Sequence, residues 1–371
     1  MKKILFLINS LCGGGAEKSL VTLVNNLDKD KYEITVMTIF DEGIYKDALD
    51  EKIKYRTIIK TKNKFLKKLF AYLVCFKLSK KWVYKRLIKK KYDYDIEIAF
   101  LEGVPTKLLS VSNASKKFAW VHTDMYNYYS QEKAYKTVEN AIDIYKSYSK
   151  IVLVSSVAKE GFIKRFNLEE NLVVKYNAID ENEIALKSKE RIELERKNRP
   201  LVVSVGRLVE QKAYDRLLRV VKKLVDDGMS LDLWLVGDGP MRPQFEEYVL
   251  DNNLRDFVKF VGFSSNPYKY MKQADIFVSS SVVEGFSLVS VEALHCENVL
   301  VLTDVGGARE LLNDSQFGIL VENSENGIMD GLKKVILSKD TFDFYKRKTK
   351  ERAKDFRCEK SIKSIENLFE E

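Results

Sequence analysis

Two glutamates, Glu284 and Glu292, stand eight positions apart in a stretch that combines a loop with a helix start. A strand expected at Ile276–Ser279 turns at Gly285, and a helix is expected to open at about Ser287. The first amides of such a helix have no partner within it and attract phosphate. Carboxylates accept hydrogen bonds from hydroxyls and repel phosphate. The pattern therefore suits a ligand with hydroxyls at both ends and phosphate between them, such as a nucleotide-sugar, although two glutamates at this spacing also arise by chance.

Cations follow another expected strand in the same half of the chain. Gly206 and Arg207 come directly after a strand expected at Leu201–Val205, and Lys212 lies a few residues further on. A planar guanidinium and a mobile ammonium both suit the oxygens of a diphosphate, although two surface cations before a helix would look the same. Phe263, at the end of a later strand, either lines a base pocket or belongs to the core.

The amino-terminal half has candidates of its own. A continuous apolar strand at Lys2–Asn9 leads into a glycine run that includes Gly14 and Gly15, and then into a helix. This order lets the backbone approach a phosphate closely, but it also describes a plain tight turn. His122 follows an expected strand, and nearby Asp124 favours a functional role, whereas a lone histidine is usually structural.

Strands and helices alternate along the chain, which predicts an α/β fold with parallel sheets. Its 371 residues are enough for two domains. A charged stretch before the strand at Leu201 separates two Rossmann-like domains, over 1–180 and 181–355. Ligands of such folds bind at the carboxyl ends of the strands, so we expect the site in a cleft between the domains.

The net charge of +9 is concentrated in one segment. Residues 60–91 contain 13 Lys/Arg and no Asp/Glu, which leaves 9 − 13 = −4 for the remainder. Apolar residues recur there at helical spacing from Phe65 to Phe76, in runs too short to span a bilayer. The segment predicts a helix that either lies on an anionic membrane surface or exposes a solvated Lys-rich face. No recognition motif for nucleic acid accompanies the charge.

The four cysteines are scattered without a metal-binding spacing, which argues against a zinc site and indicates a reducing cytoplasm. Lysine outnumbers arginine, and Ile, Asn and Tyr are abundant, a bias typical of an AT-rich bacterial genome. The expected location is therefore a bacterial cytoplasm, at the inner face of the membrane if the basic segment binds lipid.

Jointly and in order, the motifs resemble family 4 glycosyltransferases of the GT-B fold, in which two Rossmann-like domains face each other across a cleft. The resemblance covers nearly the whole chain and is strongest from 201 to 310. The segments that carry it are Gly13–Glu17, Trp120–His122, Tyr176–Asp180, Val205–Leu208, Gln211-Lys212, Val236–Pro240, Glu284–Ser287, Glu292-Ala293 and Thr303–Gly307.

The resemblance implies a retaining hexosyltransferase that moves a sugar from a nucleotide-diphosphate donor, UDP-linked, to an acceptor hydroxyl without a bound metal or cofactor. Arg207 and Lys212 would hold the diphosphate, Glu292 the ribose, and Glu284 the donor sugar near His122. The domain 1–180 would be the acceptor side, completed by a helix at 356–371 that crosses back, and 181–355 would bind the nucleotide-sugar. The catalytic residues implied are His122, Glu284, Arg207 and Lys212, and the substrate-binding ones are Gly14, Gly15, Gly206, Phe263, Gly285, Phe286, Leu288, Val289 and Glu292.

Some positions depart from the family pattern. Ala213 and Ala178 stand where the family usually has glycine, and Glu297 and Val299 replace a common Gly and Pro. These changes affect the geometry of backbone turns and no proposed contact group. A bacterial member with a basic amphipathic segment is expected to extend a lipid-linked oligosaccharide for a surface polysaccharide, such as capsule, O-antigen or lipopolysaccharide.

Three other functions fit parts of the sequence. A metal-dependent transferase of the other common architecture would use Asp-x-Asp, a spacing found at Asp28–Asp30 and Asp93–Asp95. A GT-B epimerase would alter the nucleotide-sugar without an acceptor. A non-catalytic peripheral membrane adaptor on the same scaffold would release no nucleotide.

Overall fold

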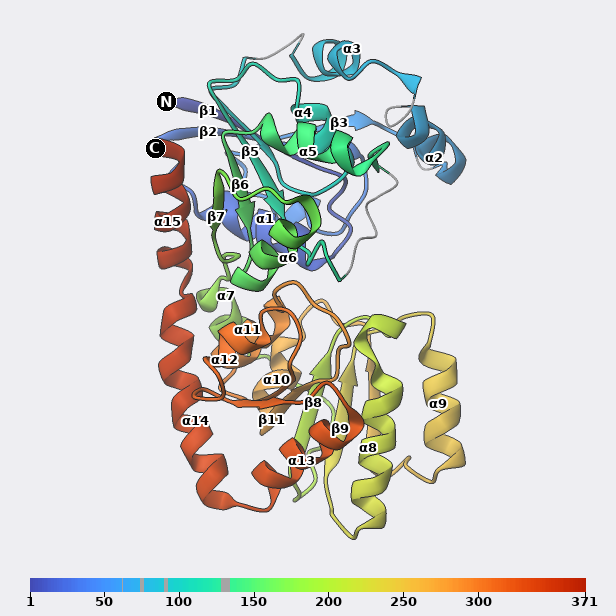
Figure 1. Ribbon diagram of the computed structural model, residues 1–371. Helices are drawn as coiled ribbons and strands as arrows, with labels where there is room; N and C mark the ends of the chain where they lie inside the picture. Colours follow the sequence, from blue (N-terminus) through green and yellow to red (C-terminus); the bar gives the residue numbers. More distant parts are fainter. Residues whose placement is uncertain (62, 74–76, 90–92, 128–133) are drawn as a thin grey trace. The chain divides into compact units, whose positions relative to one another are not determined.

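A computed structural model describes residues 1–371 except 62, 74–76, 90–92 and 128–133. The chain divides into two compact units, one made of Met1–Ala178 with Cys358–Glu371 and the other of Ile179–Arg357 (Figure 1). Each unit is a parallel sheet between helices, so the predicted α/β class is confirmed.

In the described part of the first unit, seven strands lie in the order β3-β2-β1-β4-β5-β6-β7, all of them parallel. The central strand is buried from Ile4 to Ile8, because both faces of a parallel sheet are covered. The order of the strands reverses between β1 and β4. The strands are β1 Lys2–Ile8, β2 Tyr32–Phe40, β3 Lys54–Ile59, β4 Ile96–Ala99, β5 Lys116–Val121, β6 Lys150–Leu153 and β7 Leu172–Val174.

The last helix of the chain, α15, completes the first unit. The Phe369 ring lies 6.4 Å from the Phe6 ring and 5.9 Å from the Phe118 ring, and Tyr32 Oη donates to Glu370 Oε1 at 3.0 Å. The helix is thus anchored to the sheet by aromatic packing. The helices of the first unit are α1 Gly15–Asn26, α2 Lys64–Tyr72, α3 Lys80–Val83, α4 Val104–Leu109, α5 Val138–Lys146, α6 Ser156–Phe166 and α15 Cys358–Glu370.

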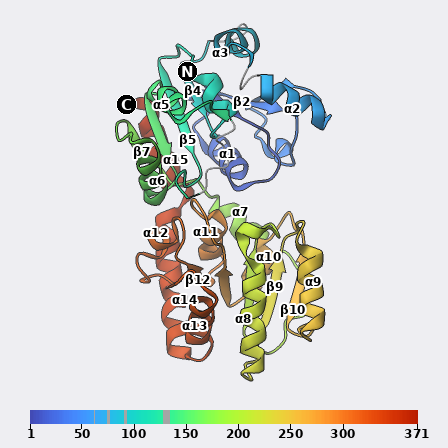
Figure 2. The same cartoon turned by 45° about the vertical axis from the view of Figure 1, so that its right-hand side comes forward.

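The basic segment 60–91 differs from the single helix that its spacing predicts. It forms two helices: α2 ends at Tyr72, and α3 begins at Lys80. A π-helical turn at Tyr84–Ile88 follows α3. Phe76 lies outside the described residues. Figures 1 and 2 both show α2 and α3 at the periphery of the first unit, outside its sheet. Among the described residues, no helix combines the length and the hydrophobicity needed to cross a bilayer.

In the second unit, six parallel strands lie in the order β10-β9-β8-β11-β12-β13. The order reverses between β8 and β11, and ligands of open parallel sheets bind outside the carboxyl ends of the strands at such a reversal. Elementary sheet topology therefore places a ligand beside the loops after these two strands. The strands are β8 Leu201–Val205, β9 Asp232–Val236, β10 Val258–Gly262, β11 Ile276–Ser279, β12 Val299–Thr303 and β13 Ile319–Val321.

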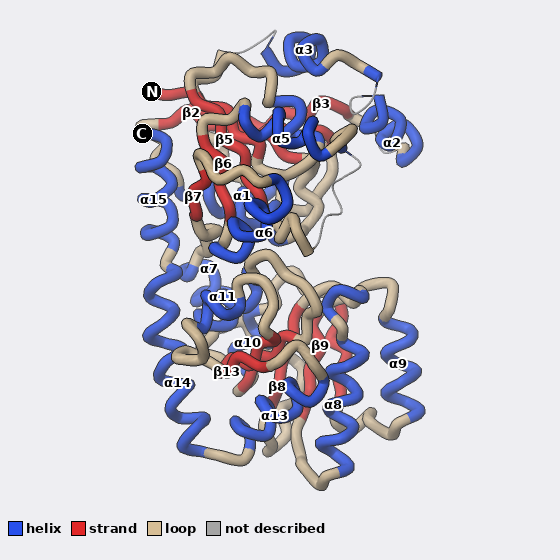
Figure 3. The backbone as a smooth tube through the Cα atoms, in the orientation of Figure 1, coloured by secondary structure: helices blue, strands red, loops and turns tan. Residues whose placement is uncertain are grey.

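Helices cover both faces of this sheet, as Figure 3 shows in blue around the red strands. Helix α8 contacts both α9 and α13 on one face, and α7, α10 and α11 contact one another on the other. Helix α8 packs on the core with Leu217, Val221 and Leu224, which are fully buried. The helices are α7 Glu181–Lys187, α8 Tyr214–Asp226, α9 Arg242–Asp251, α10 Tyr268–Gln273, α11 Leu288–His295, α12 Ala308–Leu312, α13 Glu325–Ile336 and α14 Lys339–Ala353.

Candidate functional site

The loops that follow β8 and β9 lie against each other through glycine. Gly237 has a φ of 144°, and a Cβ at this position would overlap with the carbonyl oxygen of Gly206. The amide of Gly206 donates to the carbonyl of Val236 at 3.0 Å. These contacts fix the chain directly before Arg207, whose side chain is exposed.

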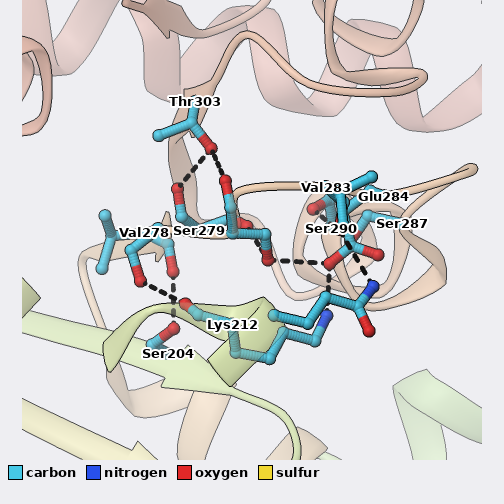
Figure 4. A network of polar contacts seen from close by, with 12 residues as sticks. Ser204, Lys212, Val278, Ser279, Val283, Glu284, Ser287, Ser290 and Thr303 are labelled. Carbon is cyan, nitrogen blue, oxygen red and sulfur yellow. Dashed lines mark hydrogen bonds and ion pairs between the residues drawn. The ribbon is translucent and has the colours of Figure 1, made fainter. Parts of the chain in front are cut away.

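Lys212 and Glu284 form an ion pair at the reversal point of the second sheet (Figure 4). Lys212 closes the short turn after β8, and Glu284 lies in the loop after β11. The two side chains are 20% and 13% exposed. The Ser281 hydroxyl donates to Glu284 Oε1 at 2.8 Å. The predicted diphosphate cation and the predicted sugar carboxylate therefore neutralise each other in a partly buried setting.

The same two loops are also joined by hydrogen bonds to backbone carbonyls. Gln211 Nε2 donates to the carbonyl of Val283 at 2.9 Å, and the amide of Val282 donates to the carbonyl of Gln211 at 3.0 Å. The Ser280 hydroxyl donates to the carbonyl of Lys212 at 2.8 Å. Residues far apart in sequence are thus held at one place because β8 and β11 are neighbours.

Helix α11 begins beside Glu284. Ser287 is its N-cap residue, and the Ser290 hydroxyl donates to the Ser287 hydroxyl at 2.8 Å. Leu288 and Val289 are its first two residues, whose amides have no acceptor within the helix. Together with Lys212, these amides offer donors suited to an anion.

A glycine turn after β12 supports the loop that carries Glu284. Gly306 has a φ of 51°, and a Cβ there would overlap with the carbonyl of Glu284. The Gly307 amide donates to the carbonyl of Gly285 at 2.8 Å. The motif Asp304–Gly307 therefore acts as a backbone support.

Glu292 lies on the inner side of α11. It is 6% exposed and accepts a hydrogen bond of 3.1 Å from the hydroxyl of Tyr268 on α10. The helix places it one turn beyond the free amides. The start of α11 thus lies between Glu284 and Glu292 in sequence.

Two predicted aromatic residues have opposite environments. Phe263 follows β10 and is 67% exposed, so it does not belong to the core. Phe286 is 7% exposed, and its ring lies 5.9 Å from that of Phe356. The ring of Phe286 is therefore part of the core of the second unit.

His122 belongs to the first unit, at the end of β5. Its ring lies 4.9 Å from the Phe100 ring, and its Nε2 is buried without a hydrogen-bond partner among the described residues. Burial lowers the pKa of His122 to about 3, and a hydrogen bond to the Phe100 backbone opposes this shift. The imidazole is therefore neutral at physiological pH.

The carboxylate that holds the His122 segment is Glu102, which no sequence motif indicates. Glu102 is 1% exposed, and its Oε1 accepts from the amides of His122 at 2.6 Å and Thr123 at 2.9 Å. Burial raises the pKa of Glu102, and the hydrogen bonds it accepts oppose this shift. Asp124, which lies near His122 in sequence, accepts from the amide and side chain of Asn127 at 3.2 Å and 2.7 Å.

Gly14 and Gly15 lie at the start of α1, after β1. Gly14 is the N-cap residue and Gly15 the first helical residue. A Cβ at Gly14 would overlap with the carboxylate of Glu17, which folds back over the helix start. The loops after β1, β4 and β5 all leave the same edge of the first sheet, where its strand order reverses.

The predicted site residues thus form two groups. The second unit brings Lys212 into contact with Glu284 and places the start of α11 after the same loop, with Arg207 nearby in sequence. The first unit places His122 and the glycine turn at one sheet edge.

Helix α2 has an inner and an outer face. On the inner face Lys67 is ion-paired with Glu42, and the Phe70 ring lies 6.4 Å from the Phe40 ring. The apolar side chains on the outer face are exposed by 40% to 70%. They are Phe65, Leu66, Leu69 and Tyr72.

The two Asp-x-Asp segments lie directly before strands. Asp28 Oδ1 accepts from the amide of Asp30 at 2.9 Å, before β2. Asp95 Oδ2 accepts from the amide of Lys3 at 2.7 Å, before β4. Both lie at the amino ends of their strands, the edge opposite to the one where parallel sheets bind ligands.

Comparisons with known proteins give the family. The family described as "Glycosyl transferases group 1" matches residues 187–355. A Campylobacter jejuni protein named N-acetylgalactosamine-N,N'-diacetylbacillosaminyl-diphospho-undecaprenol 4-alpha-N-acetylgalactosaminyltransferase is 32% identical over 369 aligned positions, and the match covers 96% of each chain.

Solved structures share the fold over the full chain. HepE of Anabaena, solved with UDP-glucose, has a TM-score of 0.77 at 20% identity, and TarM of S. aureus, solved with UDP among its ligands, has 0.75 at 15%; each match covers 100% of both chains. These likenesses confirm the GT-B fold. With a curated relative at 32% identity along 96% of its length, the chain belongs to the group 1 glycosyl transferases and is a glycosyltransferase.

Proposed function

We propose that this glycosyltransferase moves a sugar from a UDP-linked donor to an acceptor hydroxyl, with retention of the anomeric configuration and without a bound metal. The observation that carries the proposal is the Lys212–Glu284 pair beside the free amides of α11. It provides a cation and helix amides for a diphosphate, and a carboxylate for sugar hydroxyls, at the reversal point of one sheet.

Residues of the second unit then bind both the diphosphate and the ribose of the donor. Arg207, Lys212 and the amides of Leu288 and Val289 bind the diphosphate, and Glu292 binds the ribose. Arg207 is exposed and forms no ion pair among the described residues, so it is available to an incoming anion. UDP as the carrier is supported by the solved GT-B proteins that contain UDP or UDP-glucose.

The remaining predicted positions shape the pocket. Phe263 offers an exposed ring to the base, and Gly206, Gly285 and Phe286 contribute backbone. Glu284 must leave Lys212 when the donor binds, and it then accepts hydrogen bonds from hydroxyls of the donor sugar. Binding thus exchanges one ion pair for charge-assisted contacts to both ends of the sugar–phosphate bond.

Departure of the diphosphate is the step that the second unit assists. As the bond between the sugar and the phosphate breaks, negative charge grows on the leaving group, and preorganised cations and amides stabilise it. Because its pKa is about 3, His122 remains neutral and acts as a hydrogen-bonding group toward the donor sugar rather than as a charged acid. Gly14 and Gly15 give the first unit a backbone surface for phosphate and acceptor.

We further propose a lipid-linked oligosaccharide of a bacterial surface polysaccharide as the acceptor. Support comes from the Campylobacter jejuni relative, whose name describes transfer to a sugar carried on diphospho-undecaprenol. Exposed Phe65, Leu69 and Tyr72 on α2, in a segment without acidic residues, fit a helix that rests on anionic lipid. Each well-placed Lys or Arg contributes about 1 kcal/mol to such binding.

A transfer assay tests the proposal. Thermal unfolding with a panel of UDP-sugars identifies the donor, because a ligand at 100 times its Kd stabilises the folded form by about 2.7 kcal/mol. The selected donor is then incubated with a synthetic lipid-diphosphate oligosaccharide, and product mass and anomeric configuration are measured. We expect an acceptor-dependent product of retained configuration. Altered donor sugar formed without acceptor would instead identify an epimerase, and no UDP release at all would identify a non-catalytic adaptor.

A further inference from the structure

Arg216, the third residue of α8, is a buried arginine that donates to backbone carbonyls. It is 8% exposed, and none of the ion pairs among the described residues includes it. Its Nε donates to the carbonyl of Ser280 at 2.8 Å, and its Nη2 donates to the same carbonyl and, at 2.9 Å, to that of Ser281. Its Nη1 donates to the carbonyl of Asn323 at 3.3 Å.

Burying a cation lowers the stability of the fold unless its hydrogen bonds satisfy groups that an apolar side chain would leave without a donor. A guanidinium loses hydration on burial, which lowers the pKa of Arg216, while Asp215 and Glu325 favour its charged form. An apolar side chain of similar length would pack against α8 at lower cost but would leave the loop carbonyls without donors.

The other carbonyls of this loop also accept from side chains. The Thr303 hydroxyl donates to the carbonyls of Ser279 at 3.4 Å and Ser281 at 2.8 Å (Figure 4). Gln211 Nε2 donates to the carbonyl of Val283 at 2.9 Å. Carbonyls of the segment 279–283, which ends directly before Glu284, therefore accept from side chains of β12, α8 and the turn after β8.

We infer that Arg216 is a positioning residue that holds the 279–284 loop so that Glu284 meets the donor sugar in the reactive geometry. The inference rests on the proposed role of Glu284. It explains why Arg216 is buried although its side chain contacts none of the groups proposed to contact the ligand. Displacement of a reacting group by about 1 Å is enough to lower a rate by about 100-fold, so a loop anchor of this kind has a measurable effect on turnover.

A double-mutant cycle with Glu284 tests the inference. Arg216→Met removes the donors and keeps an apolar stem, and Arg216→Lys keeps the charge with one donor group. We expect Arg216→Met to lower kcat about 10- to 100-fold in the wild-type background but less than about threefold in a Glu284→Gln background, with Arg216→Lys intermediate. Equal losses in both backgrounds would show that Arg216 does not act through Glu284 and would overturn the inference.

Arg219→Met is the matched control. It removes a guanidinium from the same helix, where Arg219 pairs with Asp215 at 2.9 Å and with Glu325 at 2.5 Å. We expect an unchanged kcat, and a loss equal to that of Arg216→Met would count against positioning. If Arg216→Met does not fold, Thr303→Val removes one loop anchor at nearly constant volume and should show the same dependence on Glu284. Glu284→Gln alone separates the two proposals: full activity there refutes the proposed site, whereas additive losses refute only the role of Arg216.

Discussion

Replacing Glu284 with glutamine is expected to strengthen UDP binding and weaken sugar transfer. Glutamine keeps the shape and the oxygen that accepts from Ser281, but it removes the charge that pairs with Lys212. In the free protein Lys212 would then lack its competing anion. UDP would gain a cation that is already available, whereas the donor sugar would lose a charged acceptor.

The exposure of the pair sets the magnitude. With side chains 20% and 13% exposed, its contribution lies between those of surface and buried pairs, at about 1–3 kcal/mol. If about 1 kcal/mol of this opposes UDP binding, Glu284→Gln lowers the Kd for UDP roughly fivefold. A hydrogen bond to a charged group contributes about 1.5–3 kcal/mol, so kcat/KM for transfer should fall about 10- to 150-fold.

Calorimetric titration with UDP and steady-state transfer kinetics measure both effects on the same variant. Glu325→Gln is the control, because Glu325 pairs with Arg219 and Lys223 in the same unit without contacting the proposed site. We expect it to leave the Kd and kcat/KM unchanged. Weaker UDP binding in Glu284→Gln, or undiminished transfer, would refute the role given to the Lys212–Glu284 pair.

Three further predictions concern backbone strain, pH and lipid. Ala213 has a φ of 48°, so Ala213→Gly should raise the free energy of unfolding, measured in urea, by about 0.5–1 kcal/mol. Ala178→Gly, at a position without positive φ, should lower this free energy. Equal effects of the two substitutions would contradict the strain argument. The pKa of His122 is 6.5 unfolded and about 3 folded, so protonation of the unfolded chain lowers the free energy of unfolding by about 1–2 kcal/mol from pH 6.5 to 5. His122→Gln should reduce this loss in paired denaturant titrations, and an identical pH dependence would refute the burial of a neutral ring. Replacing Phe65 and Leu69 with serine should abolish co-sedimentation with anionic vesicles, and retained binding would exclude α2 as the lipid contact.

Apolar runs were enough to predict the central strands of the two sheets. The central strands of both units, β1 and β8, consist mostly of apolar residues, because parallel strands are buried on both faces. Two strands escaped this reasoning. Lys54–Ile59 is an edge strand without a fully buried residue, and Ile319–Val321 has only three residues, so neither carries a distinctive pattern.

The candidate site was predictable where a strand end carries a motif. Lys212 and Glu284 follow neighbouring strands, and parallel pairing brings such ends together. Glu102 and Arg216 carry no comparable signal, because their roles depend on which backbone groups they meet after folding. The contacts of Asp124 with Asn127 carry no such signal either, because closeness in sequence to His122 does not decide which groups a carboxylate meets.

At Ala213 the structure gives the physical consequence of a departure from the family pattern. The sequence indicates only that alanine replaces a usual glycine, and the structure shows that the position has the left-handed conformation for which glycine is suited. Glu297, with a φ of 65°, is a second such case. Ala178 is not, so the same substitution has different consequences at different positions.

The most direct test of the diphosphate site is the Kd for UDP in Lys212→Met, measured by calorimetry against the wild type. Lys222→Met is the matched control, because Lys222 lies on α8 and pairs only with nearby Asp226 among the described residues. We expect the Kd to rise at least about tenfold in Lys212→Met, since a charge-assisted contact of about 1.5–3 kcal/mol is lost, and to stay constant in Lys222→Met. Wild-type affinity in Lys212→Met, or an equal loss in both variants, would contradict the site proposed for the donor.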